Sequence, residues 1–243
     1  MNEYDYSIYY RNWHDESPEH HAIMAQSKAA EIGRNLKLHP TARILDIGCG
    51  FGFALGGLRA LGYQNIMGVE QSPQQAAVCR VAGFEVEVTS DTIKWLKAHP
   101  SQFDGALLFD VLEHVPVPIQ IDFLRAVYTT LKPGGTLLLT VPNANSILAA
   151  RWLHNDYTHF SSFTEHSLSF VLVNAGFVKT WISNEKGMGR FPRRIWLRRN
   201  WPAIRKWLVR WCWLQVFKAE QSYEQIDNIS FELNLTAVAA KNV

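Results

Sequence analysis

Apolar runs and helix-like segments alternate through the middle of the chain. Most of the apolar runs are continuous at their cores, as is typical of strands covered on both faces of a sheet. Strands that alternate with helices predict right-handed crossovers and a mostly parallel sheet. The five runs are ARILDI (42–47), NIMGVE (65–70), FEVEVT (84–89), FDGALLF (103–109) and TLLLTV (136–141).

Start and stop signals mark the helices between these runs. Ser17-Pro18-Glu19 combines a capping hydroxyl, a proline at the first helical position and an acid, which together predict a helix start. Ser72-Pro73 gives the same signal, and Asp91 and Thr164 are further expected caps. The helices predicted in this way cover residues 17–37, 72–83, 91–99, 118–131 and 164–176, and another follows residue 52 and ends near residue 62.

Two later runs bring the expected sheet to seven strands. They are FVKTWIS (177–183) and ISFELNLTAVAA (229–240). Residues 142–163 are polar and aromatic and are predicted to form a loop. The fold class is therefore α/β, with a doubly wound, mostly parallel sheet in a single domain.

The stretch ILDIGCGFG (44–52) places Gly48, Gly50 and Gly52 at every second position after a predicted strand. A turn that leaves a strand needs unusual backbone angles, and glycine adopts them readily. A dinucleotide fingerprint is excluded because its third glycine would stand where Phe53 stands. A phosphate-binding P-loop is excluded because no lysine followed by Ser or Thr is present. What remains is acid-x-Gly-x-Gly-x-Gly.

This pattern resembles motif I of the class I S-adenosylmethionine-dependent methyltransferases. FDGALLFDVLEHVP (103–116) resembles motif IV of the same family, and LKPGGTLLLTVPN (131–143) resembles the segment that forms its fifth strand. The resemblance covers roughly residues 20–182 and the last strand. It implies a Rossmann-like fold, S-adenosylmethionine as the cofactor, and an enzyme that transfers a methyl group.

The resemblance also suggests roles along the cofactor site. Glu70 ends the second strand, where a carboxylate accepts hydrogen bonds from both ribose hydroxyls, and Gln71 would lie along the same wall. The family often places an acid after the third strand to meet the adenine amino group. Asp91 and Thr92 stand there, although Asp91 also suits a plain helix cap.

The remaining cofactor residues follow the first and fourth strands. Gly48, Cys49 and Gly50 would approach the cofactor through their backbone, and Asp46 would order that glycine backbone. Phe109 and Asp110 end the fourth strand, where they are expected to reach the sulfonium end of the cofactor.

His114 and His159 are the candidate catalytic residues. Transfer of a methyl group from a sulfonium is a direct displacement that needs an aligned nucleophile. A hydroxyl nucleophile also needs a base as it attacks. His114 follows the fourth strand, and His159 lies in the loop that covers the substrate in this family. The alternative for His114 is a packing role in the pocket wall.

Asp110, Glu113 and His114 form a D-x-x-E-H pattern. It resembles the metal-binding cluster of the ubiquinone-pathway O-methyltransferases, where oxygen ligands would suit magnesium or calcium. However, the same residues are common at this position in methyltransferases that use no metal. The expectation is therefore that the protein holds no metal.

Charge is distributed unevenly along the chain. Ten Lys or Arg and no acid lie between Lys186 and Ala219, and because the net charge is +2, the rest of the chain carries −8. Five of the nine tryptophans fall in the same stretch. The chain is thus divided into an N-terminal lid and helix (1–40), a cofactor-binding core (41–185), a basic aromatic insertion (186–225) and a last strand (226–243).

Within the insertion, residues 190–217 are divided by Pro202. Beyond it one side of a predicted helix is apolar, and another side is basic. Arginine flanking tryptophan suits a helix that lies in a membrane interface. The alternatives are packing on the domain itself or a homodimer, and nucleic-acid binding is not expected. The apolar positions are Ile204, Trp207, Leu208, Trp211 and Leu214, and the basic ones are Arg205, Lys206 and Arg210.

The compartment is expected to be the cytoplasm, at the inner face of the membrane if the insertion binds lipid. No run of about 18 apolar residues exists, and the N-terminus is unlike a signal peptide. The three cysteines are scattered and form neither a disulfide framework nor a metal cluster. Tyr9, Tyr10 and Trp13 would either form a lid over the site or pack against the sheet.

The pattern VPN…THFSSFT…L…AGF resembles methyltransferases of bacterial surface-polysaccharide assembly. It motivates the hypothesis of O-methylation of a sugar or glycolipid intermediate. The runner-up is a quinone-type or small-metabolite O-methyltransferase. The rival class is a non-catalytic module that keeps the cofactor fold, and titration with S-adenosylhomocysteine would discriminate it from an enzyme.

Overall fold

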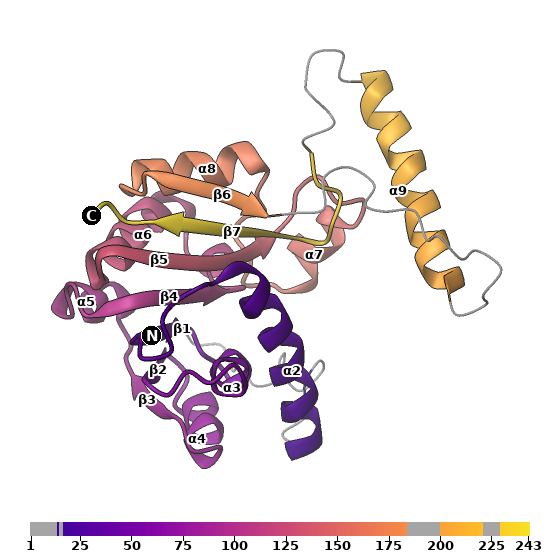
Figure 1. Cartoon of the computed structure of the whole chain (residues 1–243). Helices are drawn as coiled ribbons and strands as arrows, with labels where there is room; N and C mark the ends of the chain where they lie inside the picture. Colours follow the sequence, from indigo (N-terminus) through magenta and orange to yellow (C-terminus); the bar gives the residue numbers. More distant parts are fainter. Residues whose placement is uncertain (1–13, 15–16, 184–199, 221–228) are drawn as a thin grey trace.

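The central element is a seven-stranded sheet with the strand order β3-β2-β1-β4-β5-β7-β6 (Figure 1). The computed structural model describes residues 14, 17–183, 200–220 and 229–243. Strands β1 to β5 pair in parallel, and β7 is antiparallel to both of its neighbours. The predicted α/β fold with a mostly parallel sheet is confirmed.

The strands lie where the apolar runs predict them. Two boundaries differ clearly. Leu131 already pairs with Phe103, so β5 includes the Lys-Pro-Gly-Gly segment that was expected to be a turn. The last strand begins at Asn234, later than the predicted start at residue 229. The strands are β1 (Ile44–Ile47), β2 (Ile66–Glu70), β3 (Glu85–Val88), β4 (Phe103–Phe109), β5 (Leu131–Pro142), β6 (Lys179–Ser183) and β7 (Asn234–Ala240).

The helices begin at the predicted caps. The side chains of Ser17, Ser72, Asp91 and Thr164 each accept a hydrogen bond from the backbone N–H three residues later. The α-helices are α2 (Pro18–Asn35), α3 (Phe53–Ala60), α4 (Pro73–Val81), α5 (Thr92–Ala98), α6 (Gln120–Thr130), α7 (Ala149–Asn155), α8 (Glu165–Asn174) and α9 (Trp201–Glu220), and two 3₁₀ turns are η1 (Leu112–His114) and η2 (Val117–Ile119).

Helices cover both faces of the sheet. Apolar residues of α5, α6 and α8 pack on one set of strand positions, and those of α2, α3 and α4 pack on the alternate set. Leu137 and Leu139 of β5 thus face one layer, while Leu138 faces the other. Burial on both faces explains why the strand cores are continuous apolar runs.

Helices α2 and α3 approach each other closely through glycine. A Cβ atom on Gly57 would lie 2.7 Å from the backbone nitrogen of Ala29, and one on Gly56 would lie 2.8 Å from Cβ of Ala25. Such distances leave no room for a side chain. This close packing holds α2 beside the glycine-rich loop that precedes α3.

Residues 142–163 are not wholly loop, and that prediction is wrong for the segment that forms α7. Both ends of the segment meet at the edge of the sheet, because Asn143 bridges to Phe163 and Ala144 N donates to Phe163 O at 2.8 Å. No residue of α7 is buried. A helix with so little apolar burial leaves a weak periodic signal in the sequence.

Helix α9 stands away from the sheet and its covering helices (Figure 1). It begins at Trp201 with Pro202 as its second residue, where the sequence predicts the break. Its inner side packs Leu214 against Ile229 and Phe231, with Trp213 and Phe217 at the border.

Arg210 corrects the predicted faces of α9. It was expected on the basic side with Arg205 and Lys206, away from the apolar positions, but it is 8% exposed and donates to Glu232 Oε1 at 3.0 Å. Arg210 lies three residues after Trp207 and four before Leu214, so helical geometry places it on their side. Leu208 and Trp211 are exposed instead.

Some predictions fall outside the described part of the chain. These are the lid residues Tyr9, Tyr10 and Trp13, and the first part of the insertion up to residue 199. Among the described helices, none is both long enough and apolar enough to cross a membrane.

Candidate active site

The glycine-rich loop between β1 and α3 has the unusual backbone that the sequence predicts. Gly48, Gly50 and Gly52 have φ angles of 70°, 52° and 80°, which side chains rarely tolerate. The N–H groups of Gly48 and Cys49 donate to Val69 O at 2.8 and 3.3 Å. These bonds hold the loop against the end of β2.

Glu70 ends β2 and joins the loop to the next helix. Its Oε2 accepts from Gly50 N at 2.9 Å, and its Oε1 accepts from Gln71 N at 2.8 Å and Ser72 N at 2.9 Å. The side chain is 8% exposed. A carboxylate has about four acceptor positions, so Oε2 keeps the capacity to accept a further donor.

Asp46 is buried beside the loop, but it does not hold the loop amides as predicted. Those amides donate to Val69 and Glu70 instead. Oδ2 of Asp46 has no hydrogen-bond partner among the described residues. Burial, together with the negative charge of Glu70, raises the pKa of Asp46 to about 7, although Lys28 opposes the shift. A buried, unpartnered carboxyl oxygen fits a cationic group of a ligand.

Lys28 of α2 is a site residue that the sequence analysis missed. Its Nζ lies 3.2 Å from Glu31 Oε2, 3.8 Å from Asp110 Oδ2 and 4.1 Å from the centre of the Phe109 ring. Burial lowers the pKa of Lys28, but the neighbouring acids more than reverse this effect, so the pKa is raised. The sequence signal is its spacing, three residues after buried Ala25 and four before buried Ile32.

Phe109 and Asp110 lie at the end of β4, as predicted. Asp110 has a φ angle of 55°, which turns the chain sharply as it leaves the strand. Its Oδ1 accepts from Thr140 Oγ1 at 3.0 Å and from Asn234 Nδ2 at 3.2 Å. Asp110 therefore links the ends of β4, β5 and β7 and faces Lys28.

The predicted adenine side is formed by two neighbouring strand ends. Gln71 Nε2 donates to Thr92 Oγ1 at 3.1 Å, which brings these two predicted residues together. Asp91 Oδ1 accepts from Lys94 N at 2.9 Å, so the plain cap exists. A contact between Asp91 and adenine stays a prediction.

The two candidate catalytic histidines are brought together. The ring centres of His114 and His159 lie 4.6 Å apart, with the rings in a T-shaped arrangement. His114 belongs to η1 after β4, and His159 belongs to the loop after β5 and α7. Phe160 N donates to Glu113 O at 2.8 Å, and this hydrogen bond links the loop after α7 to the turn after β4.

Burial favours the neutral forms of His114 and Glu113. It lowers the pKa of His114 to about 4, and the neighbouring His159 adds to the shift. Burial and the charge of Asp110 raise the pKa of Glu113 well above its usual value. Glu113 is 1% exposed, and its Oε2 has no partner among the described residues. A neutral imidazole in this setting is able to accept a proton.

Three residues in this cluster offer metal ligands. Atoms of Glu113, His114 and His159 lie within 4.8 Å of one another, and no other group of this kind occurs among residues 14, 17–183, 200–220 and 229–243. The group differs from the D-x-x-E-H pattern, since His159 replaces Asp110. Two imidazoles and one carboxyl favour transition metals over magnesium. The expectation that no metal is held stays a prediction.

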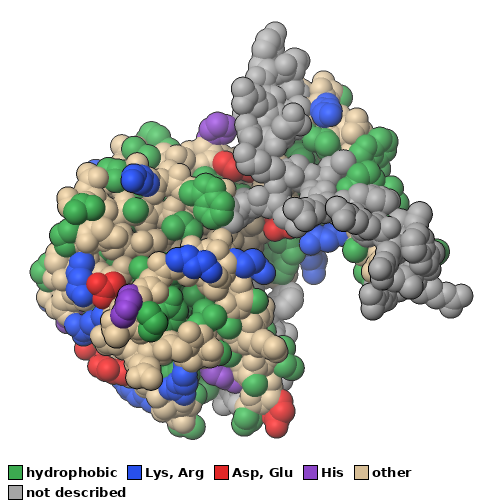
Figure 2. All heavy atoms as spheres, viewed as in Figure 1, with side chains coloured by type: hydrophobic (Ala, Val, Ile, Leu, Met, Phe, Trp, Pro, Cys, Tyr) green, Lys and Arg blue, Asp and Glu red, His purple; other side chains and the backbone are tan. Residues whose placement is uncertain are grey.

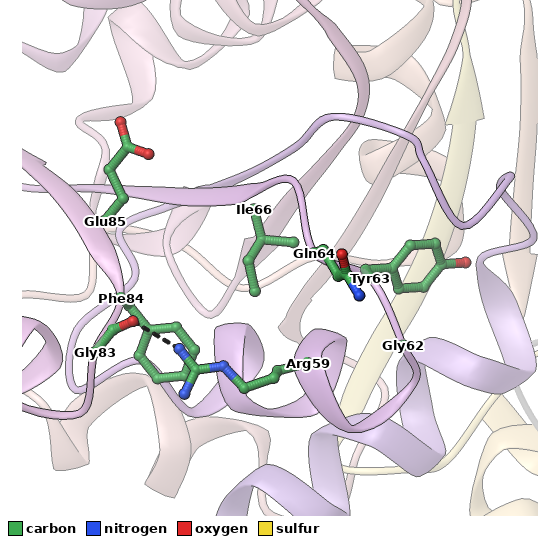
Figure 3. A pocket seen from close by; sticks show the side chains of 8 residues that line it. All are labelled: Arg59, Gly62, Tyr63, Gln64, Ile66, Gly83, Phe84 and Glu85. Atoms are coloured by element: carbon green, nitrogen blue, oxygen red, sulfur yellow. Dashed lines mark hydrogen bonds between the residues drawn. The ribbon is translucent and has the colours of Figure 1, made fainter.

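Two open cavities lie at the opposite edge of the sheet. One, of about 430 Å³, is lined by residues at the amino ends of β2 and β3 (Figure 3). Its Arg59 donates to Gly83 O at 2.7 Å and covers the ring of Phe84, so its guanidinium is already engaged. The other, of about 420 Å³, lies beside Asp104 and Lys132, which pair at 2.8 Å. Neither cavity adjoins the glycine loop.

The chain is similar to known proteins in both sequence and fold. Residues 12–180 match a family model described as a methyltransferase domain. Among curated proteins, a ubiquinone biosynthesis O-methyltransferase of Xanthomonas campestris is 38% identical over 109 residues, which cover 43% of this chain and 44% of that protein. One from Dinoroseobacter shibae is 34% identical over 143 residues, 56% of each chain. The chain thus spans about half the length of these relatives.

Solved structures share the fold at low identity. A SAM-dependent methyltransferase from Archaeoglobus fulgidus has a TM-score of 0.68 at 19% identity, over 98% of this chain and all of that one. A possible histamine N-methyltransferase from Thermotoga maritima has a TM-score of 0.63 at 19% identity, over 98% and 96% of the two chains. At this identity the likeness concerns the fold alone.

Proposed function

The chain belongs to the S-adenosylmethionine-dependent methyltransferases, and from this premise we propose that it methylates a hydroxyl group of a small molecule. The observation that supports an oxygen acceptor is the pair of neighbouring, partly buried imidazoles, His114 after β4 and His159 in the loop after α7. A hydroxyl needs a base when it attacks, whereas a more nucleophilic atom does not. The site divides into a donor half around the glycine loop and an acceptor half around His114.

In the donor half, five residues suit the parts of S-adenosylmethionine. Glu70 would accept from the ribose hydroxyls. Lys28 would pair with the carboxylate of the methionine part, and the unpartnered Oδ2 of Asp46 would accept from its ammonium group. The pairing of opposite charges in a buried site contributes more than it would in water. Gln71 and Thr92 would line the adenine side.

In the acceptor half, His114 or His159 would take the proton of the acceptor hydroxyl. S-adenosylmethionine, when bound, supplies a methyl group on a sulfonium, and the electron pair of the broken carbon–sulfur bond stays on sulfur. The proton then leaves the imidazole to solvent. The residues of the chain thus align the hydroxyl, exclude water and hold the proton.

We favour a quinone-type or phenolic acceptor over a sugar. The curated relatives named above are ubiquinone biosynthesis enzymes, and the rim of the acceptor half is apolar. Val117 and Ile119 follow His114 and are 56% and 41% exposed, and Tyr157 and Phe160 flank His159 and are 88% and 56% exposed. An apolar rim suits an aromatic ring better than it suits a polyhydroxylated sugar.

The test is a methyl-transfer screen with methyl-labelled S-adenosylmethionine. The acceptor panel contains catechol-type phenols with and without an alkyl chain, together with nucleotide sugars. The proposal expects label in the phenol ether. Label in a sugar alone would contradict a phenolic acceptor and favour the surface-polysaccharide hypothesis. Label on nitrogen would contradict an oxygen acceptor.

We further propose that α9 lies against an anionic membrane surface. Its outer side combines apolar and basic residues, and its single acid is the last residue, Glu220. Hydrophobic and basic side chains gather at the upper right of Figure 2, where α9 stands in Figure 1. Arg205 and Lys206 are exposed with them. The exposed apolar residues, each between 43% and 54% accessible, are Trp201, Leu208, Val209, Trp211 and Val216.

Liposome co-sedimentation tests this contact. Vesicles with anionic lipid should bind the protein, and the double change Arg205→Gln and Lys206→Gln should weaken binding roughly thirtyfold, at about 1 kcal/mol for each charge. Val81→Gln is a matched control, because Val81 is 90% exposed on α4, away from α9. Equal sedimentation with neutral and anionic vesicles, or none with either, would contradict the proposal.

A further inference from the structure

A chain of hydrogen bonds runs from Asp156 through Thr158 to His114. Thr158 Oγ1 lies 2.7 Å from Asp156 Oδ1 and 2.8 Å from His114 Nδ1. The backbone N–H of Thr158 also donates to Asp156 Oδ1, at 2.8 Å. Asp156 is 3% exposed. The three residues join the loop after β5 to the turn after β4.

The direction of each hydrogen bond follows from which atom has a proton to give. An ionised carboxylate only accepts, so the single hydroxyl proton of Thr158 is committed to Asp156. The backbone N–H of Thr158 points at the same carboxylate oxygen, so this oxygen accepts from both groups of Thr158. The hydrogen between Thr158 and His114 must therefore come from Nδ1 of the imidazole.

We infer that Asp156 and Thr158 are positioning residues that hold His114 as the Nδ1–H tautomer, with the lone pair on Nε2. This inference rests on the proposed oxygen methylation, because it supplies the base with the atom that accepts the hydroxyl proton. The tautomer itself does not depend on which acceptor is methylated.

The same arrangement stabilises the charge that forms on His114. When Nε2 takes a proton, the ring becomes a cation and its Nδ1–H bond to Thr158 strengthens. The carboxylate of Asp156 lies one residue further along the chain of bonds and provides the opposite charge. Charge-assisted hydrogen bonds are roughly twice as strong as neutral ones. The burial that favours neutral His114 is thus partly offset at the moment of proton transfer.

His159 is held in the same tautomer by a different partner. Its Nδ1 lies 3.0 Å from the carbonyl oxygen of Trp152, which only accepts, so Nδ1 again carries the hydrogen. Its Nε2 lies 3.9 Å from Asp156 Oδ2. The backbone carbonyl at Trp152 cannot be removed by a side-chain substitution, whereas the partner of His114 can. The test therefore uses Thr158.

The first readout is the tautomer of His114, measured by long-range proton–nitrogen NMR on protein with labelled histidine and saturating S-adenosylhomocysteine. His114→Asn assigns the signal. Wild type and Thr158→Ser should show Nδ1–H, and Thr158→Val should shift the signal towards Nε2–H. Thr158→Ala is the second variant, if valine prevents folding. An Nε2–H signal in wild type, or an unchanged Nδ1–H signal in the folded variant, overturns the inference.

The second readout is kinetic and uses the acceptor found in the screen. Thr158→Val should lower kcat by roughly 100-fold with little change in KM, within the range of general-base catalysis, and Thr158→Ser should restore most of it. Ser161→Ala is the matched control, because Ser161 lies on the same loop but bonds Gln120. If the NMR result holds and no methyl transfer to oxygen is found, the proposed function fails and the tautomer assignment stands. A loss in Ser161→Ala equal to that in Thr158→Val would overturn the role of Thr158 in catalysis.

Discussion

The donor half and the acceptor half are built by different means. In the donor half, a short loop with three left-handed glycines folds onto the end of the neighbouring strand, and its bonds are to backbone groups or to Glu70. In the acceptor half, side chains from two separate segments meet, as His114 and Thr158 do across 44 positions. The donor half therefore forms mainly from contacts between neighbouring strand ends, whereas the acceptor half depends on the position of the loop after β5.

The largest expected effect is a loss of catalysis that leaves cofactor binding intact, and it should distinguish the acceptor half from the donor half. His114→Asn removes the proposed base and should lower kcat by about 10²–10⁴-fold. The affinity for S-adenosylhomocysteine should stay close to that of wild type, because His114 is not in the donor half. Steady-state kinetics on the acceptor from the screen checks this. A variant with wild-type kcat would remove His114 from catalysis and leave His159 as the base.

The second effect concerns stability against pH. The pKa of His114 is lowered to about 4 in the folded protein. The unfolded chain therefore takes up protons first as the pH falls, and stability present above about pH 6.5 is lost towards about pH 4. This loss amounts to at most about 3 kcal/mol.

Protonation of Asp46 changes the stability of the fold in the opposite direction. Its pKa is raised to about 7 in the folded protein, so the folded state holds the extra proton and gains stability as the pH falls from about 7 towards about 4. Urea unfolding at the two ends of this range should show that His114→Asn loses less stability on acidification than wild type. Asp46→Asn should lose more. Identical pH profiles in all three proteins would contradict the assigned burial effects.

The third effect falls on cofactor affinity. Glu70→Ala removes the carboxylate that accepts from Gly50 N and, as proposed, from the ribose. Hydrogen bonds to a charged group contribute about 1.5–3 kcal/mol, so the dissociation constant should rise about 10- to 100-fold. Equilibrium dialysis with labelled S-adenosylmethionine measures this rise. Unchanged affinity would mean that the ribose is held elsewhere.

The smallest expected effect is the contribution of Lys28 to cofactor affinity. Lys28→Met keeps much of the side-chain volume and removes the charge, and should weaken S-adenosylhomocysteine about tenfold, for the loss of one charge-assisted contact. Methylthioadenosine lacks the amino acid part and should bind the variant and the wild type alike. If both ligands weaken equally, Lys28 supports the fold of the site and does not contact the carboxylate.

The sequence predicts the donor half well because its chemistry follows fixed positions at strand ends. The glycine loop, Glu70 and the caps of the helices lie where their patterns place them. Lys28 was missed because its helix is only loosely periodic, so its spacing from Ala25 and Ile32 gives a weak signal for burial. Its setting depends on the close packing of α2 on α3.

The acceptor half was predicted only in part. His114 and His159 were named as separate candidates, but their contact and the link through Thr158 depend on tertiary structure. The D-x-x-E-H pattern groups Glu113 and His114 with Asp110, whereas the structure places possible ligand atoms of His159 beside them. In α9, Arg210 was assigned to the basic side because its partner, Glu232, lies 22 residues away.

The most direct test of the separation between the halves is a calorimetric titration with S-adenosylhomocysteine. Wild type and His114→Asn are titrated side by side. The donor half should bind one ligand in each protein, with dissociation constants that agree within about twofold, well under the tenfold that 1.4 kcal/mol would give. No binding to wild type, or an affinity lost when His114 is replaced, would contradict a donor site that forms independently of the acceptor site.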